Sequence, residues 1–79
     1  MIDKKKLIEI IQTALDDDQI DINSSMNNVE AWDSLGHIAI LTKLDIELSG
    51  KASSIESLGA ADSVLKIINA LTSSGFFSE

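Results

Sequence analysis

A serine, an aspartate and a histidine lie close together in this sequence, at Ser34, Asp33 and His37. These are the residue types of a hydrolase triad, in which the aspartate orients the histidine and the histidine faces the serine. All three crowd one turn at the start of an expected helix, and a chain of 79 residues leaves little room for a pocket with an oxyanion hole. We therefore expect no catalysis, and we interpret His37 as a partly exposed helix residue.

Ser34 is better placed to carry a group than to perform chemistry. It begins an apolar helical pattern directly after Asp33, which can cap the helix. The first N–H groups of a helix lack partners and form the positive end of its dipole, which favours an anion such as a phosphate ester on the serine oxygen. Gly36, on the same turn, is expected to keep side-chain bulk away from an attached group. From these residues alone, an unmodified serine at a helix start is the alternative.

Apolar residues recur at helical spacing in three longer segments and one short one. The expected helices are residues 4–15, 34–48, 53–58 and the stretch between Asp62 and Ser73. Asp3 and Asp62 are the expected caps of the first and last helices, and Gly50 ends the second. Ser53 and Glu56 have the spacing of a capping box. The prediction is an all-α fold, a small four-helix bundle with three longer helices and one short helix.

One domain accounts for residues 1–79, with about 3–72 structured and 73–79 as a tail. A polar connection from Asp16 to Asp33 separates the first two helices, and a loop of this length is uncommon unless it is functional or tied down. Its apolar residues are expected to anchor it to the helices. These anchors are Ile20, Ile22, Met26, Val29 and Trp32. For Phe76 and Phe77 in the tail, the sequence leaves open whether they fold back, meet a partner or stay loose.

The second expected helix carries two apolar stripes, although a surface helix needs only one. The stripe assigned to the core is Ile40, Leu41, Leu44 and Leu48. The other stripe begins beside Ser34 and consists of Leu35, Ile38, Ala39 and Ile46. Docking of other proteins would explain this second stripe. The alternative is that both stripes are buried.

Composition narrows the classes of partner. The net charge is −7, from 13 acidic residues against 6 basic ones, so the surface repels nucleic acid and anionic membrane and suits basic patches. The acidic run from Asp16 to Asp21 lacks the glycine and glutamate of a calcium loop, so we expect no metal site there.

The chain has no cysteine, so any thiol must come from an added group. Without a signal-peptide pattern or an apolar run near the roughly 20 residues of a membrane span, we expect a cytoplasmic protein.

In its helix order, its long first connection, its size and its acidity, the stretch from Ile2 to Leu71 resembles the acyl carrier proteins, with Asp33-Ser34-Leu35 at the start of the second helix. The resemblance implies that Ser34 bears a covalent 4′-phosphopantetheine arm. It also implies that Asp33 helps to bind the transient Mg²⁺ used by the phosphopantetheinyl transferase. The protein would then be a non-catalytic monomer in lipid or polyketide biosynthesis, presenting acyl thioesters to synthase, acyltransferase or acyl-loading enzymes. The partner-binding residues would be Leu35, Gly36, Ile38, Ala39, Thr42, Asp45 and Ile46.

Two other functions fit the sequence: a peptidyl or aminoacyl carrier, and an unmodified acidic adaptor that binds proteins through the second helix. The family also suggests that Ile40 and Leu44 could part from the short third helix to shelter an acyl chain, although a closed core fits equally well. The second helix departs from the family because Ile46 and Gly36 stand where acids are common. Docking should therefore depend more on apolar contact, which points to a dedicated pathway.

Overall fold

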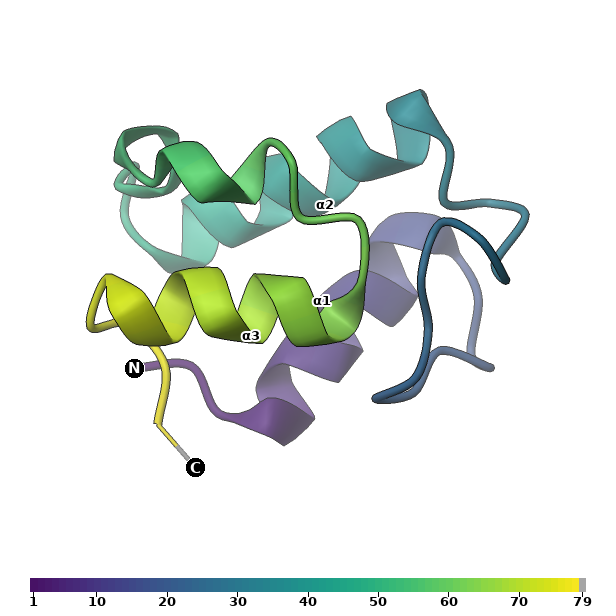
Figure 1. The fold of residues 1–79 in the computed structure, drawn as a ribbon, viewed down its shortest axis with the longest axis horizontal. Coiled ribbons are helices and arrows are strands. Elements are labelled where there is room, and N and C mark those ends of the chain that lie inside the picture. Colours follow the sequence, from purple (N-terminus) through teal and green to yellow (C-terminus); the bar gives the residue numbers. More distant parts are fainter. Residues whose placement is uncertain (79) are drawn as a thin grey trace.

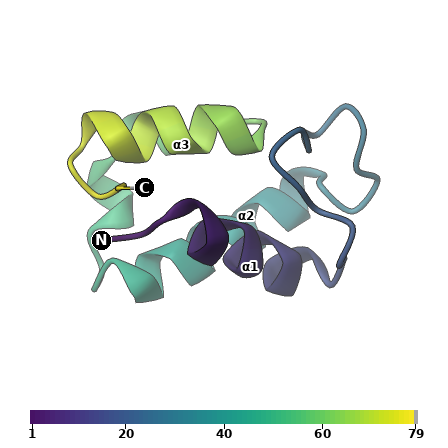
Figure 2. The same ribbon diagram turned by 90° about the horizontal axis from the view of Figure 1, so that it is seen from below.

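The computed structural model describes residues 1–78 and contains three α-helices, α1 (Lys4–Leu15), α2 (Ser34–Glu47) and α3 (Val64–Ser73). Two 3₁₀ turns, η1 (Ala52–Ser54) and η2 (Glu56–Leu58), connect α2 to α3. α1 and α2 run antiparallel, and α3 lies across them with the η1–η2 segment beside it (Figure 1). The long 16–33 connection closes one end of the molecule and both termini lie at the other end (Figures 1 and 2). The described chain is thus all-helical, as predicted, with no strand in residues 1–78 beyond isolated bridges.

The first helix has the predicted bounds. The Asp3 carboxylate accepts a hydrogen bond from the Lys6 N–H at 2.8 Å, so Asp3 is its N-cap. Lysines stand at the positive end of the helix dipole, where they are unfavourable, and no acid stands in the first turn. Burial of the apolar face must therefore hold the helix, at about 1.5–3 kcal/mol for each fully buried large side chain. The buried residues of α1 are Leu7, Ile10, Ile11 and Leu15.

The second helix begins at Ser34 as predicted and ends at Glu47, one residue early, with Leu48 as its C-cap. Gly50 follows with φ +84° and donates its N–H to the Asp45 carbonyl at 2.8 Å. The left-handed residue directly after the C-cap is Ser49, with φ +56°, so Gly50 lies one position beyond the C′ position that was predicted for it. Ile40, Leu44 and Leu48 are buried in the core as predicted, and Leu41 is half-buried against it.

The segment predicted as a short third helix forms two separate 3₁₀ turns, and the predicted capping box does not form. Ser53 lies inside η1, and neither turn has a side-chain cap among the described residues. The buried residues of this segment recur at every third position, which suits three residues per turn better than an α-helix. They are Ala52, Ile55, Leu58 and Ala61.

The cap of α3 is Ser63, so the prediction of Asp62 was wrong by one residue. The Ser63 hydroxyl accepts from the Lys66 N–H at 3.1 Å, while Asp62 forms an ion pair with the Lys66 Nζ at 3.1 Å. An antiparallel bridge to Ser25 holds Ser63 in the extended conformation that an N-cap needs. The Val64 N–H donates to the Ser24 carbonyl at 3.0 Å, which ties the long connection to the start of α3.

The long connection is tied down by its apolar residues, as expected, with one exception. Ile20 and Trp32 are buried, and Ile22 and Val29 are half-buried against the core. Met26 is 37% exposed, so its prediction as an anchor was wrong. Its backbone N–H, rather than its side chain, makes the attachment, through a 2.9 Å bond to the Asp62 carbonyl.

The described part of the C-terminal tail, residues 74–78, folds back onto the core, and Glu79 lies outside the described residues. The Ile2 N–H donates to the Phe76 carbonyl at 2.9 Å, and the Ser78 N–H donates to the Ile2 carbonyl at 3.0 Å. Both Phe76 and Phe77 are half-buried against the core. The ordered region therefore extends beyond residues 3–72 at both ends. Of the three possibilities that the sequence left open for the tail, the structure selects folding back.

Candidate functional site

Ser34 occupies the first turn of α2 and is exposed. Its hydroxyl makes no hydrogen bond to any residue of the described chain, so it is free to react or to be modified. Beside it lies an open hollow of about 590 Å³, formed with the end of the long connection and lined in part by Asn27, Val29 and Glu30. The structure thus places the predicted residue at a helix N-terminus with open space around it.

Asp33 caps the helix that carries Ser34. Its Oδ1 accepts the Gly36 N–H at 2.8 Å, and its carbonyl accepts the His37 N–H at 2.8 Å. The backbone at Asp33 is extended, as expected of an N-cap. The second carboxylate oxygen accepts no hydrogen bond from residues 1–78 and is available to an external ligand.

Gly36 has a different role from the one predicted. A Cβ at this position would collide with the Ala31 carbonyl oxygen and lie 2.9 Å from the Leu15 Cδ2. Gly36 therefore faces inward, where the long connection and α1 approach α2, rather than toward a group on Ser34. Its place on the partner face stays a prediction.

We expect Gly36→Ala to destabilise the protein by about 1–3 kcal/mol, because the new methyl group overpacks a rigid backbone contact. This cost should exceed the gain of about 1 kcal/mol that alanine normally has over glycine in a helix. Gly59→Ala is the matched control, because its nearest neighbour, the Glu56 carbonyl oxygen, is 3.6 Å away and its φ is −61°. Urea denaturation should show a loss for the first variant and none for the second. Equal stability of both variants would contradict this packing role.

His37 is 9% exposed, so the prediction of a partly exposed residue was wrong. Its Nδ1 lies 3.1 Å from the Trp32 Nε1 and its Nε2 lies 2.9 Å from the Leu58 carbonyl oxygen. The Trp32 indole can only donate, so Nδ1 accepts and Nε2 carries the proton. With both ring nitrogens engaged, His37 has no free nitrogen to activate Ser34. This geometry agrees with the argument against a triad.

The outer stripe of α2 is exposed, which overturns the alternative that both stripes are buried. Leu35, Ile38 and Ile46 are 77%, 58% and 73% exposed. Large apolar side chains left in water on one helix are typical of a binding surface. Leu35 directly follows Ser34, so this surface begins at the candidate modification site.

The other residues predicted on the partner face differ in their surroundings. Thr42 is exposed and its hydroxyl donates to the Ile38 carbonyl at 2.9 Å. Ala39 is half-buried. The half-buried Asp45 accepts the Ala52 N–H at 3.0 Å, which engages one of its carboxylate oxygens within the protein. This contact could not be predicted from the sequence, because Asp45 and Ala52 lie on different elements.

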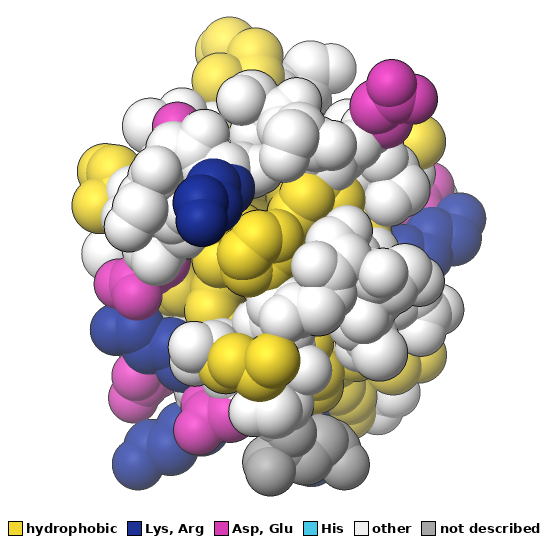
Figure 3. Space-filling model, turned by 90° about the vertical axis from the view of Figure 1, so that its left-hand side faces the viewer, with side chains coloured by type: hydrophobic (Ala, Val, Ile, Leu, Met, Phe, Trp, Pro, Cys, Tyr) yellow, Lys and Arg dark blue, Asp and Glu magenta, His cyan; other side chains and the backbone are white. Residues whose placement is uncertain are grey.

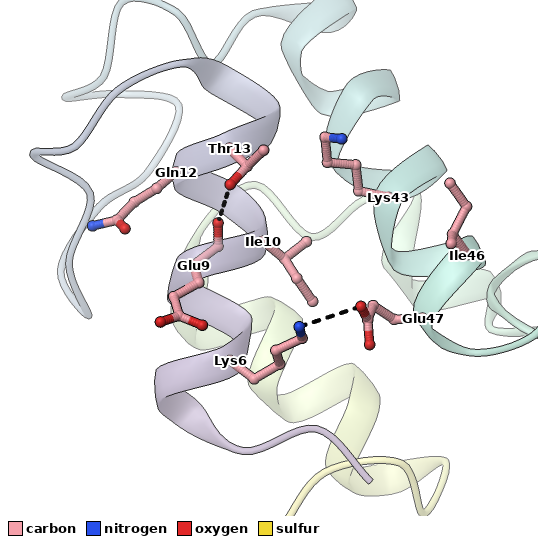
Figure 4. Close-up of a pocket in the computed structure, with 8 residues that line it drawn as sticks. All are labelled: Lys6, Glu9, Ile10, Gln12, Thr13, Lys43, Ile46 and Glu47. Carbon is pink, nitrogen blue, oxygen red and sulfur yellow. Dashed lines mark hydrogen bonds and ion pairs between the residues drawn. The ribbon is translucent and has the colours of Figure 1, made fainter.

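Two further hollows flank α2. One, of about 450 Å³, lies between α1 and α2, with the Lys6–Glu47 ion pair at 3.4 Å and Ile46 at its border (Figure 4). The other is an apolar groove of about 370 Å³ between α2 and residues 52–59, lined in part by Ile38, Leu41 and Ile55. Ile40 and Leu44 are fully buried, so the core that could have parted is closed.

The end of the molecule that carries η1 and the termini also has apolar side chains at its surface. Figure 3 shows these apolar side chains on the floor of a hollow near the middle of the view, with a basic side chain near the edge of the hollow. Acidic and basic side chains gather along one side of this view. This face lies at the opposite end of the molecule from the start of α2 (Figure 1).

No cluster of three metal-binding side chains occurs among residues 1–78. The described helices are all too short or too polar to cross a bilayer. Comparison with protein-family models, curated proteins and solved structures finds no match to this chain.

Proposed function

We propose that this protein is a carrier of acyl groups, bound as thioesters to a 4′-phosphopantetheine arm on Ser34. The observation that carries the proposal is the exposed, unbonded hydroxyl of Ser34 on the first turn of α2, directly after the capping carboxylate of Asp33. The unpaired N–H groups and the positive end of the helix dipole favour a phosphodiester at that position. The resemblance to acyl carrier proteins supplies the identity of the group.

The chain's part in attachment is to present a nucleophile. In the transfer, the Ser34 Oγ forms a bond to the β-phosphorus of coenzyme A, the phosphoanhydride bond breaks, and 3′,5′-ADP leaves. The serine proton passes to a base of the transferase. The free carboxylate oxygen of Asp33 fits a ligand of Mg²⁺, which prefers oxygen donors and often joins carboxylate and phosphate.

Two features favour acyl cargo and protein partners. The groove between α2 and residues 52–59 is mainly apolar and lies along the helix that begins with Ser34. The exposed Leu35 and Ile38 offer partner enzymes an apolar contact beside the arm, while the net charge of −7 favours partners with basic patches. The protein itself performs no chemistry. It raises the effective concentration of a tethered thioester for each enzyme in turn.

The proposal is tested by incubating the purified protein with a phosphopantetheinyl transferase of broad specificity, coenzyme A and Mg²⁺. Intact-mass spectrometry should show the gain of a single phosphopantetheinyl group. A chain that stays unmodified while a known carrier in the same tube is converted would contradict the proposal and favour the adaptor. Loading with acyl or aminoacyl coenzyme A analogues then compares the stability of the two thioesters.

We expect Asp33→Asn to slow this modification by about 10–100-fold, the range seen when a group that orients a metal is lost. Asparagine caps a helix as well as aspartate does, so stability should change by less than about 0.5 kcal/mol. Glu30→Gln removes the same charge from the hollow beside Ser34 without touching the cap, and its labelling rate should match the wild type. Equal slowing in both variants would assign the effect to general charge instead of to Asp33.

A further inference from the structure

Met26 is held through its backbone while its side chain stays at the surface. Its N–H donates to the Asp62 carbonyl at 2.9 Å, and the neighbouring Ser25 forms a bridge with Ser63. The residue is nonetheless 37% exposed. Methionine is flexible and polarisable, so it packs against differently shaped apolar surfaces and is frequent on binding surfaces. A methionine that is fixed in place and left in solvent is therefore suited to contact another protein.

Met26 lines the open hollow of about 590 Å³ that Ser34 also lines. The half-buried Val29 adds a second apolar residue to this lining, and the exposed Glu30 and Asp33 make it acidic. No lysine or arginine is among the described residues that line the hollow. Because Ser34 belongs to the same hollow, an enzyme that brings a reactant to the Ser34 Oγ must cover the hollow.

The charge at this end of the molecule has one sign. Between Lys6 and Lys43 the sequence has no lysine or arginine, and its acidic residues there are Glu9, Asp16, Asp17, Asp18, Asp21, Glu30 and Asp33. All of these except Glu9 lie on the 16–33 connection, which closes the end of the molecule where α2 begins (Figures 1 and 2). The lysines that begin α1 lie at the opposite end.

The acids of the connection are not neutralised within the described chain. The ion pairs of residues 1–78 join Lys6 to Glu47 and Lys66 to Asp62. The acidic run that starts at Asp16 also follows the C-terminal end of α1, where the helix dipole is negative and acids are unfavourable. This arrangement costs stability in the free protein, and a positively charged partner would relieve it.

The outer face of α2 has less free negative charge than the connection. The Asp45 Oδ1 is engaged by the Ala52 N–H at 3.0 Å, and Lys43 on the same helix is basic. A partner with a basic surface is therefore attracted to the connection more than to the later turns of α2.

We propose that the hollow beside Ser34 is the docking surface for the enzyme that modifies this serine. The enzyme inserts an apolar side chain beside Met26 and Val29, and the lysines or arginines around that side chain face the acidic connection. This inference rests on the proposed function, because it takes the partner to be an enzyme that acts at Ser34. It adds which surface that enzyme contacts and the chemistry of its binding segment.

The kinetics of modification test this docking surface. Met26→Gln keeps the backbone bonds and the length of the side chain but removes its apolar end. The KM of a phosphopantetheinyl transferase of broad specificity for this variant should rise at least about threefold, while kcat stays within about twofold of the wild type. Leu65→Gln is the matched control, because Leu65 is 52% exposed on α3 and does not line the hollow. Its KM should equal that of the wild type.

The results separate this inference from the proposed function. A wild-type protein that is never modified contradicts the proposed function, and the docking surface with it. If the wild type is modified and Met26→Gln has an unchanged KM, the proposed function stands and the docking surface is overturned. An equal rise of KM for Met26→Gln and Leu65→Gln overturns it as well.

The charge of the partner is tested with a triple variant, Asp16→Asn with Asp17→Asn and Asp18→Asn. Asparagine tolerates the left-handed backbone at Asp16, where φ is +52°, and keeps the oxygen that Asp17 presents to the Gln19 N–H at 2.9 Å. At about 20 mM salt its kcat/KM should fall at least about threefold, and the difference should vanish near about 0.5 M, where charges are screened. Glu30→Gln removes a single charge from the connection, so its rate should stay close to that of the wild type.

Glu9→Gln with Glu47→Gln and Glu56→Gln is the control of equal net charge. These three acids are exposed and lie outside the connection. Their triple variant should keep the wild-type kcat/KM at low salt. An equal fall in both triple variants, or a fall in neither, would show that a basic partner does not face the connection.

Discussion

Ser34→Ala is expected to abolish modification of the protein by a phosphopantetheinyl transferase and to leave its stability within about 0.5 kcal/mol of the wild type. The physical reason is that the hydroxyl is exposed and makes no hydrogen bond within the described chain. The cap of α2 is supplied by Asp33 instead. Intact mass after incubation measures the first effect, and urea denaturation followed by circular dichroism measures the second.

Ser63→Ala is the matched control, because it should lower the stability of the protein and leave modification by the transferase unchanged. Ser63 caps α3 through a 3.1 Å bond from the Lys66 N–H, so its loss should cost about 0.5–2 kcal/mol. Modification at Ser34 should proceed at the wild-type rate while the domain stays folded. A Ser34→Ala variant that still gains the group, or that unfolds, would contradict the assigned roles of these two serines.

Trp32→Ala is expected to cost about 3–5 kcal/mol of stability, the range for removing a large buried aromatic side chain. Trp32 is 1% exposed and joins the end of the long connection to the core. A small domain has only about 5–15 kcal/mol in total, so much of the protein should unfold in mild denaturant. Circular dichroism is the suitable probe, because the variant lacks the only tryptophan.

Trp32→Phe separates packing from hydrogen bonding at this position. It keeps most of the apolar volume and removes the N–H that His37 accepts at 3.1 Å. The expected loss is about 1–3 kcal/mol, smaller than that of the alanine variant. A loss below about 1 kcal/mol for Trp32→Ala would mean that the end of the connection does not depend on this side chain.

The α-helices were predictable because their signals are local. Apolar spacing and the cap at Asp3 define α1, and the same signals together with Gly50 define α2 to within one residue. The outer apolar stripe of α2 was visible in the spacing, but its exposure was not, because the same spacing allowed both stripes to be buried. The position of Ser34 follows from the start of α2.

The short segment before α3 was mispredicted because two patterns compete there. Ser53 and Glu56 have capping-box spacing, but the apolar residues Ala52, Ile55 and Leu58 recur every third position, which favours 3₁₀ turns. The three-residue apolar period was present in the sequence, and it predicts the structure of this segment better than the capping-box spacing does. The position of the tail could not be predicted, because it depends on the bridge between Ile2 and Phe77, which lie near opposite ends of the sequence.

The roles of Gly36 and His37 could not be predicted from spacing. Gly36 faces the Ala31 carbonyl because the long connection folds back at that point, which depends on the burial of Trp32. His37 reaches the Leu58 carbonyl, 21 residues away on η2. Both contacts depend on tertiary structure, and neither residue type indicates them.

Tandem mass spectrometry of the protein purified from cells that contain an active phosphopantetheinyl transferase tests directly whether Ser34 carries the arm. We expect one phosphopantetheinyl group per chain, with fragment ions that locate it on Ser34. A chain that carries no such group under these conditions, or carries it on another serine, would show that Ser34 is not the carrier residue.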